Sequence, residues 1–223
     1  MIRWKLIDTA AVPDGGELRL MQRDAEFSIM SGVVTLMNNR MSGSEEALAT
    51  LACARLAGRS APRLLIGGYG MGFTLRSALG ALGPDAEVTV VELIAAVIAW
   101  ARGPMAHMSG DGLSDPRVTI REGDVGALIR QASGRYDAIL LDVDNGPEGL
   151  SRKGNDRLYD AEGLAAARAA LKPGGVLAVW SSFPNAPFVK RLDRAGFAVE
   201  EARVRARGPG KGERHLIWLA TAP

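Results

Sequence analysis

Residues 63–223 alternate between short apolar runs and segments whose apolar residues recur at helical spacing. Apolar runs without a helical period are typical of strands buried on both faces, whereas apolar residues three and four positions apart are typical of helices. The pattern predicts strands at 63–67, 87–91, 117–121, 136–141 and 174–181, and helices at 71–81, 93–102, 124–132, 160–171 and 185–195. This alternation predicts an α/β fold with a mostly parallel sheet that is covered by helices on both faces.

The pattern changes at both ends of the chain. Short strand-like pieces at 17–23, 26–30 and 33–37 predict a small antiparallel β domain over residues 1–42, followed by a helix at 44–57. Ser42 or Ser44 is the expected N-cap of that helix. At the other end, residues 197–206 and 214–222 predict a terminal antiparallel hairpin. We therefore expect a seven-stranded sheet in a second domain that covers residues 43–223.

Four glycines follow the first strand of the alternation. In LLIGGYGMGFTLRSAL, residues 64–79, they are Gly67, Gly68, Gly70 and Gly72. Glycine permits a sharp turn and a close ligand, because no Cβ intervenes, and the next helix directs its first N–H groups toward that ligand. Glu92 ends the next strand, where a carboxylate typically accepts hydrogen bonds from ribose hydroxyls. Together these features predict a nucleoside cofactor.

Acidic residues also follow the third and fourth strands of the alternation. Asp124 comes after the third strand, and Asp142 comes after the fourth and is soon followed by Asp144 and Asn145. Taken singly, such residues are also typical of helix N-caps and solvated loops. Because the carboxyl ends of parallel strands meet at one edge of a sheet, their order along four successive strands predicts a shared ligand cleft.

The glycine turn is spaced G-x-G-x-G, unlike the G-x-G-x-x-G of nicotinamide and flavin dinucleotide sites. The pattern resembles class I methyltransferases that bind S-adenosylmethionine, and more narrowly the spermidine synthase-like family. The resemblance also covers VVELIAAVIAWAR, DPRVTIREGDVGALI, YDAILLDV and RLYDAEGLAAARAALKPGGVLAV. It implies a Rossmann-like class I methyltransferase fold with a small N-terminal β domain. The implied cofactor is S-adenosylmethionine or decarboxylated S-adenosylmethionine.

The resemblance also implies roles for individual residues. The glycines would line the methionine part and the sulfur side of the nucleoside, Glu92 would hold the ribose, and Asp124 would bind the adenine amino group. Asp142 stands where the family keeps its catalytic acid, as a base or an amine-orienting carboxylate, and Tyr159 follows the active-site loop. The cofactor set is Gly67, Gly68, Gly70, Gly72, Glu92 and Asp124, the catalytic set is Asp142 and Tyr159, and the acceptor set is Glu46, Asp144 and Asn145.

Several positions depart from the family pattern. Gly70 replaces the aspartate of the family's GGGDGG, and Asn145 replaces an acid of its D-S-S-D. The family's tyrosine–histidine pair is missing, and SGSEEALA, with Glu45 and Glu46, stands in its place. Glycine at position 70 leaves room for the carboxylate of ordinary S-adenosylmethionine and removes a like charge. We therefore favour methyl transfer to a small nucleophile, such as an amine. Aminopropyl transfer in polyamine biosynthesis and a non-catalytic nucleoside-binding dimer stay open as alternatives.

Composition narrows the remaining classes. The 223 residues are 47% hydrophobic, which is typical of a globular protein, and the net charge of +2 is too weakly basic to argue by itself for a nucleic-acid partner, which we do not expect. RNA methylation is a third option, supported only by arginines near the terminal hairpin. The start of the chain shows no secretory signal, and the longest apolar stretch is too short to cross a bilayer, so we expect a cytoplasmic protein without a membrane partner.

A few side chains bear on metal binding and on association into a homodimer. Two histidines far apart in sequence and a single cysteine offer no zinc-site spacing, so we expect no metal, and Cys53 is interpreted as a buried thiol. Trp100 and Trp180 are expected in the core. The apolar residues of the third N-terminal strand are candidates for the face of a homodimer; they are Val33, Val34, Leu36 and Met37.

Overall fold

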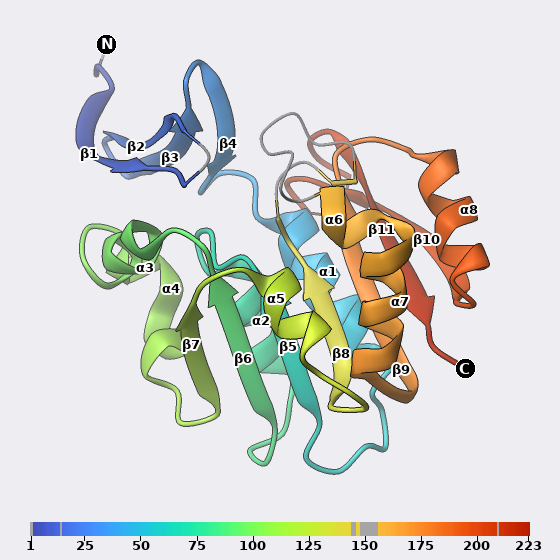
Figure 1. Ribbon diagram of the computed structural model, residues 1–223. Coiled ribbons are helices and arrows are strands. Elements are labelled where there is room, and N and C mark those ends of the chain that lie inside the picture. The colour runs from blue at the N-terminus through green and yellow to red at the C-terminus, as the bar shows by residue number, and fades with distance from the viewer. Residues whose placement is uncertain (1, 14, 144–145, 148–155, 209) are drawn as a thin grey trace.

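The computed structural model describes residues 2–13, 15–143, 146–147, 156–208 and 210–223. Its main feature is a seven-stranded mixed sheet in the order β10-β11-β9-β8-β5-β6-β7 (Figure 1). The strands are β5 (Arg63–Gly67), β6 (Glu87–Glu92), β7 (Val118–Glu122), β8 (Tyr136–Leu141), β9 (Leu171–Ser181), β10 (Ala198–Arg205) and β11 (Arg214–Thr221). Strands β5 to β9 are parallel, and the hairpin β10–β11 joins β9 antiparallel. The predicted α/β sheet with its terminal hairpin is confirmed.

The two faces of this sheet carry separate apolar clusters, because successive side chains of a strand point to opposite faces. On β5, Leu64 and Ile66 belong to one cluster, and Leu65 belongs to the other. The first cluster also contains residues of α1 (Gly43–Ala54), α2 (Phe73–Ala81) and α3 (Ala95–Arg102). The second contains residues of α5 (Val125–Arg130), α6 (Asp156–Tyr159), α7 (Ala161–Ala170) and α8 (Ala186–Arg194). The sheet is therefore covered by helices on both faces, as the alternation predicts.

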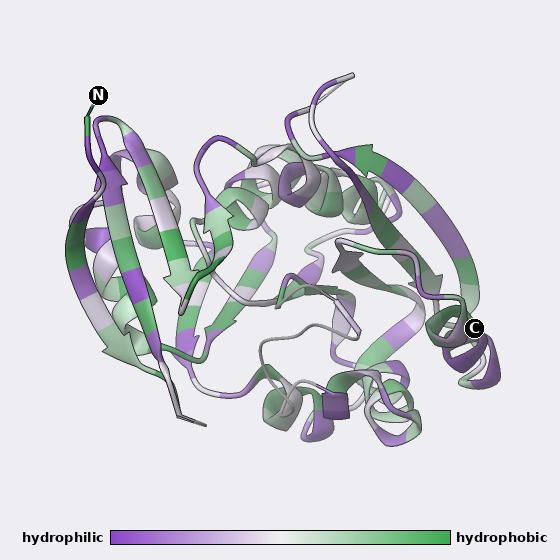
Figure 2. Cartoon of the chain, turned by 90° about the horizontal axis from the view of Figure 1, so that it is seen from above, coloured by the Kyte–Doolittle hydropathy of each residue, from purple (hydrophilic) through white to green (hydrophobic). Residues whose placement is uncertain are grey.

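A second, antiparallel sheet precedes α1. Its order is β1 (Lys5–Ala11), β2 (Glu17–Arg23), β3 (Glu26–Ser31) and β4 (Val34–Asn38). Hydrophobic and hydrophilic residues alternate along these strands (Figure 2), and Leu20 and Ile29 are buried in the same apolar cluster as Ile66. The sheet lies above the carboxyl ends of β6 and β7 (Figure 1), where the Trp100 indole N–H of α3 donates to Asp8 of β1 at 2.7 Å. We keep the division at residues 42 and 43 as a proposal, since both sides share this core.

The structure differs from the sequence prediction mainly in the short elements. The sequence does not predict strand β1, because its apolar positions do not alternate regularly. In the structure, its pairing with β2 shifts register between Leu6 and Asp8. The segment expected to be a long loop at 103–116 contains α4 (Ala106–Ser109) and the 3₁₀ helix η1 (Gly110–Ser114). Ser42 occupies the N-cap of α1 but makes no side-chain hydrogen bond there. None of the helices in the described residues is long and apolar enough to cross a bilayer.

Cys53 and Trp100 are placed largely as expected. Cys53 lies in α1 and is partly buried, and this burial raises the pKa of its thiol to about 11, so the group is an uncharged thiol at neutral pH. Trp100 is 2% exposed and belongs to the core. Neither residue contributes to the site described below.

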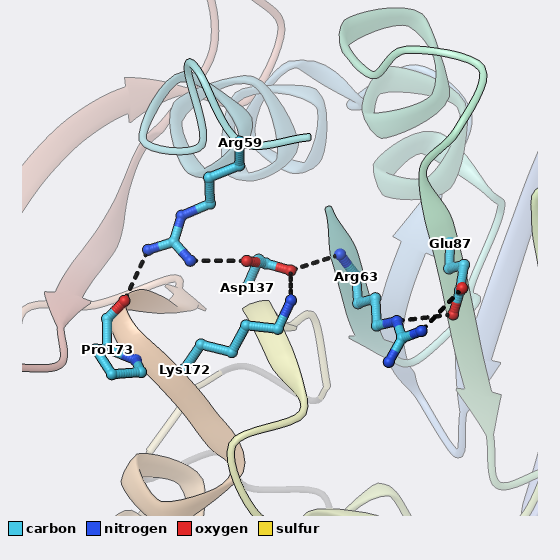
Figure 3. A network of polar contacts seen from close by, with 6 residues as sticks. All are labelled: Arg59, Arg63, Glu87, Asp137, Lys172 and Pro173. Carbon is cyan, nitrogen blue, oxygen red and sulfur yellow. Dashed lines mark hydrogen bonds and ion pairs between the residues drawn. The ribbon is translucent and has the colours of Figure 1, made fainter. Parts of the chain in front are cut away.

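The amino-terminal edge of the central sheet is fastened by one buried carboxylate, Asp137 of β8 (Figure 3). It accepts hydrogen bonds from the Arg59 guanidinium at 2.7 Å, the Lys172 ammonium at 2.7 Å and the backbone N–H of Arg63 at 2.8 Å. Burial alone would raise the pKa of Asp137, but the hydrogen bonds from Lys172, Arg63 and Arg59 outweigh it and lower the pKa. The carboxylate thus joins β5, β8 and β9 at the edge opposite the glycine turn.

We predict that Asp137→Asn lowers the free energy of unfolding at pH 7 by ~2–3 kcal/mol, because it removes a hydrogen-bonded charge among buried and half-buried partners. The folded-state pKa lies below the unfolded value of about 3.9, so this stabilisation is present above that pH and is lost as the pH falls through the folded pKa. Urea unfolding of wild type and variant at pH 7 and in acid measures the difference between their free energies of unfolding, and we expect this difference to be smaller in acid.

Glu87→Gln is the matched control, since the exposed Arg63–Glu87 ion pair drawn in Figure 3 joins β5 to β6 at the same end of the sheet. Loss of this pair changes the free energy of unfolding by less than about 1 kcal/mol. Equal effects of the two substitutions at pH 7 would contradict the role given to Asp137.

Candidate active site

Two adjoining cavities open at the carboxyl edge of the central sheet, beneath the N-terminal sheet. The larger encloses about 160 Å³ and is lined by Glu92, Asp124 and apolar side chains of both sheets. The smaller encloses about 70 Å³ and is lined by Glu45, Trp180, residues of the glycine turn and Phe73 at the start of α2. Four residues line both cavities, so the two cavities are parts of one cleft. These shared residues are Leu36, Met37, Gly70 and Asp142.

The glycine turn is held against the ends of β6 and β8 by backbone contacts. The N–H of Gly68 donates to the Val91 carbonyl at 2.9 Å, and the N–H of Asp142 donates to the Gly67 carbonyl at 3.0 Å. Gly68 has a φ of +84°, and a Cβ at this position would collide with the Asp142 carbonyl oxygen. Only glycine fits here, so the turn brings the backbone of position 68 directly beside Asp142.

The four predicted glycines serve different purposes. Gly68 and Gly70 line the larger cavity. Gly67 lies where a Cβ would press on the side chains of Leu141 and Val125, and it is a packing position. Gly72 has a φ of +79° and is the N-cap of α2. Neither Gly67 nor Gly72 lines the cavities, so the structure brings only two of the four to the cleft wall.

Glu92 is 8% exposed and connects the glycine turn to α3. One of its carboxylate oxygens accepts from the N–H of Tyr69 at 2.9 Å, and the other accepts from the N–H of Ile94 at 2.9 Å. Burial raises the pKa of Glu92, and these backbone hydrogen bonds oppose that rise. Glu92 also lines the larger cavity, so its carboxylate faces the space in which a ligand would bind.

Asp124 lies at the far end of the larger cavity, as the N-cap of α5. Its carboxylate accepts from the N–H of Gly126 at 2.8 Å and from Arg130 at 3.2 Å. The helix-capping role weighed in the sequence analysis is therefore real, and it coexists with a position on the cavity wall. A capped and partly exposed carboxylate still offers acceptor sites to a ligand donor such as an exocyclic amino group.

Asp142 and Glu45 form a pair of carboxyl groups at the smaller cavity. The Thr74 hydroxyl donates to Asp142 at 2.6 Å, and its oxygen also lies 3.3 Å from the backbone carbonyl of Glu45. Burial raises the pKa of Asp142 to about 6, although the Thr74 hydrogen bond lowers it in part. Burial, and then the nearby charge of Asp142, raise the pKa of Glu45 to about 7. The pair of carboxyl groups can therefore gain or lose a proton near neutral pH.

Glu45 is oriented by a short chain of polar groups. The buried Ser44 hydroxyl donates to Glu45 at 2.7 Å, and the same hydroxyl lies 2.9 Å from Nδ1 of His215 on β11. Burial lowers the pKa of His215, so its imidazole is neutral at pH 7. The His215 ring also packs edge-on against Trp180, with ring centroids 4.8 Å apart. The sequence shows Glu45 and Glu46 as neighbours and does not separate them. Only the fold shows that Glu45 faces the cleft and that Glu46 does not.

Two of the remaining predicted site residues, Glu46 and Tyr159, line neither of the two cavities. Glu46 forms a half-exposed ion pair with Arg76 at 2.8 Å and does not line either cavity. Tyr159 is 2% exposed and packs edge-on against Phe188 in the core beneath α7, so it is not part of the cleft wall. Asp144 and Asn145 are outside the described residues. Across the described ranges, no three His, Cys, Asp or Glu side chains gather into a group that would hold a metal ion.

The candidates for a dimer face divide into two sets. Val33 and Val34 are 93% and 50% exposed, whereas Leu36 and Met37 line the cleft. Trp180, which was expected in the core, is 8% exposed and forms part of the smaller cavity. The homodimer stays a proposal that only Val33 and Val34 of this strand support.

Comparison with known proteins shows what this chain is similar to. Residues 47–191 match the spermine/spermidine synthase domain. Polyamine aminopropyltransferase 1 of Streptomyces coelicolor is 32% identical over 149 residues, which cover 63% of this chain and 27% of that protein. Putrescine N-methyltransferase 3 of Nicotiana tabacum is 36% identical over 117 residues, which cover 52% of this chain and 29% of that protein. The chain thus matches about a quarter to a third of the length of these relatives.

The fold is also found among solved structures. Spermidine synthase from Thermotoga maritima superposes with a TM-score of 0.77 at 20% identity, covering 98% of this chain and 73% of that one. A spermidine synthase in complex with the transition-state analogue AdoDATO gives a TM-score of 0.76 at 19% identity, with the same coverage. These matches include the N-terminal sheet, which lies outside the family match. With the family domain covering well over half of its residues, the chain belongs to the spermine/spermidine synthase family.

Proposed function

We propose that this protein transfers a methyl group from S-adenosylmethionine to a small amine. The observation that carries the proposal is the meeting of two cavities at Asp142, one with nucleoside-binding features and one with a pair of carboxyl groups. A group-transfer enzyme needs such an arrangement, because the donor and acceptor atoms must lie in line on either side of the transferred carbon.

The larger cavity suits the adenosine part of the donor. Glu92 stands at the end of β6 on the cavity wall, a place where a carboxylate typically accepts hydrogen bonds from ribose hydroxyls, and Asp124 can accept from the adenine amino group. The apolar side chains of Ile94 and Val125 line the wall between them and suit the faces of an adenine ring. The absence of a side chain at Gly68 then leaves the sulfonium close to Asp142.

The smaller cavity suits an amine. An ammonium that enters it meets Glu45 and Asp142, whose raised pKa values lie close to neutral pH. One incoming positive charge therefore favours the doubly ionised form of the pair, and the carboxylates in turn offset the desolvation of the ammonium. The putrescine N-methyltransferases and polyamine aminopropyltransferases among the relatives carry amines in their names, which supports this class of acceptor.

Asp142 is the proposed base. The amine enters as an ammonium and loses a proton to Asp142, and its nitrogen lone pair then attacks the methyl carbon. A carbon–nitrogen bond forms as the carbon–sulfur bond breaks, and the electron pair of that bond goes to sulfur, which leaves as a neutral thioether. Once protonated, Asp142 can donate to the Thr74 oxygen, whose own proton can turn to the Glu45 carbonyl 3.3 Å away.

Aminopropyl transfer is the second candidate, since the relatives include enzymes named for it. It requires decarboxylated S-adenosylmethionine, which carries one more net positive charge than S-adenosylmethionine. Position 70 lines both cavities and is glycine, so it supplies no carboxylate to the donor's ammonium. We favour methyl transfer on this ground.

Calorimetric titration with the two donors separates the candidates. We expect S-adenosylmethionine to bind at least about tenfold more tightly than its decarboxylated form, a difference of about 1.4 kcal/mol, because the second donor carries an additional net positive charge for which position 70 supplies no carboxylate. Tighter binding of the decarboxylated donor would reverse the proposal in favour of aminopropyl transfer.

Removal of the proposed base tests the mechanism. Asp142→Asn keeps the shape of the side chain, so we expect donor affinity to be nearly unchanged and kcat to fall by ~10²–10⁴-fold. Glu122→Gln, on an exposed residue at the end of β7, is the control and leaves kcat unchanged. Mass-spectrometric detection of methylated putrescine measures turnover, and an Asp142→Asn protein that is as active as wild type would remove Asp142 from the mechanism.

The activity should also depend on pH in a specific direction. Asp142 must be ionised to act as a base, so kcat/KM falls as the pH drops below about 7 toward 6. Glu45→Gln removes the carboxyl group whose pKa is raised to about 7, so we expect the part of the limb near pH 7 to disappear and the fall near pH 6, which burial of Asp142 sets, to stay. An unchanged limb in the Glu45→Gln variant would show that Glu45 does not contribute to the pH profile.

The glycine turn is tested by Gly68→Ala. The new methyl group would collide with the Asp142 carbonyl and strain a backbone at φ +84°, so we expect loss of donor binding and a fall of ~1–3 kcal/mol in the free energy of unfolding. The control is Gly80→Ala in α2, where a Cβ meets no atom within 4 Å and helix propensity improves stability by up to about 1 kcal/mol. Normal donor affinity in Gly68→Ala would contradict the close approach.

A further inference from the structure

The boundary between the two cavities is made partly by the N-terminal sheet. Leu36 and Met37 belong to β4, Gly70 belongs to the glycine turn, and Asp142 follows β8, yet all four line both cavities. Any group that moves from a donor in the larger cavity to an acceptor in the smaller one passes between these residues. Residues 36 and 37 precede the segment that matches the family domain. The strand β4 therefore supplies a part of the boundary that the family match does not cover.

Met37 lies directly against the glycine at this boundary. A Cβ placed on Gly70 would be 2.9 Å from the Met37 sulfur and 3.0 Å from its terminal methyl group. The end of the Met37 side chain therefore occupies the space into which a side chain at position 70 would project. The glycine at position 70 predicts an open space for the carboxylate of S-adenosylmethionine, and the structure corrects that expectation, because the Met37 thioether of the N-terminal sheet fills this space.

A thioether at this place distinguishes the two donors by polarity and size. A methyl group on sulfur is small and apolar, so it tolerates a thioether neighbour. An aminopropyl group carries an ammonium at the end of three methylene groups. Above Gly70 that ammonium would lose water against the apolar end of Met37, because Asp142 and Glu45 serve the acceptor amine in the proposed function. The cost falls only on the decarboxylated donor when its aminopropyl group is directed toward the acceptor.

Resting on the proposed function, we infer that Met37 is the specificity-determining residue that makes the cleft select S-adenosylmethionine over its decarboxylated form. It acts from the N-terminal sheet by filling the space above Gly70. The choice of transferred group is then set by a contact between the two sheets, and not only by the residues of the glycine turn.

Three variants test this inference by calorimetric titration with both donors. Met37→Ala opens the space above Gly70, and we expect the affinity ratio between the donors to shift by about tenfold toward the decarboxylated form. Met37→Ala combined with Gly70→Asp adds a carboxylate, at a φ of +55° that aspartate tolerates better than most residues, and shifts the ratio by a further tenfold or so. Leu36→Ala, which lines the same boundary, weakens both donors alike and leaves the ratio unchanged.

The outcomes separate the inference from the proposed function. A wild-type protein that prefers S-adenosylmethionine, with the same ratio in Met37→Ala, would overturn the inference alone. A wild-type protein that prefers the decarboxylated donor would overturn both. A shift of the ratio in Met37→Ala but not in Leu36→Ala supports the inference, and thermal unfolding of each variant confirms that the fold is retained.

Discussion

The site depends on one backbone constraint, the close approach of the glycine turn to the end of β8. Strand β5 lies in the middle of the parallel sheet, so the turn after it is flanked by β6 on one side and β8 on the other. The Gly68 N–H bonds to the end of β6, the Asp142 N–H bonds to the end of β5, and no Cβ separates Gly68 from Asp142. This contact brings the nucleoside-binding side and the carboxyl pair to the same edge, and every proposed role follows from it.

Electrostatics then gives the two sides of the cleft different tasks. The carboxylate of Glu92 is held by backbone N–H groups, which fix its orientation and suit a binding role. Asp142 and Glu45 have few such donors, and burial raises the pKa of both carboxyl groups. The nearby charge of Asp142 raises the pKa of Glu45 further, so both groups can be protonated near neutral pH. At the opposite edge of the sheet, Asp137 is surrounded by cationic donors and stays ionised, which is a structural use of the same residue type.

Sequence reasoning predicted the features that depend on periodicity and chain order. Buried runs and helical spacing gave the central sheet, and the ends of its strands gave Gly68, Glu92, Asp124 and Asp142 as cleft residues. It missed what depends on contacts between distant segments. Glu45 and Glu46 are neighbours, and only the rotation of α1 directs one to the cleft and the other to Arg76. The sequence predicts Met37 as a residue of a dimer face, because the residues around β4 do not show which other element covers this side chain.

The most direct test of this account is a crystal structure of the protein with S-adenosylhomocysteine, the product of methyl transfer. The account predicts ribose hydroxyls on Glu92, the adenine amino group on Asp124 and the thioether sulfur at the boundary beside Asp142, with Met37 covering Gly70. A nucleoside bound elsewhere, or one bound with its sulfur turned away from Asp142, would contradict it.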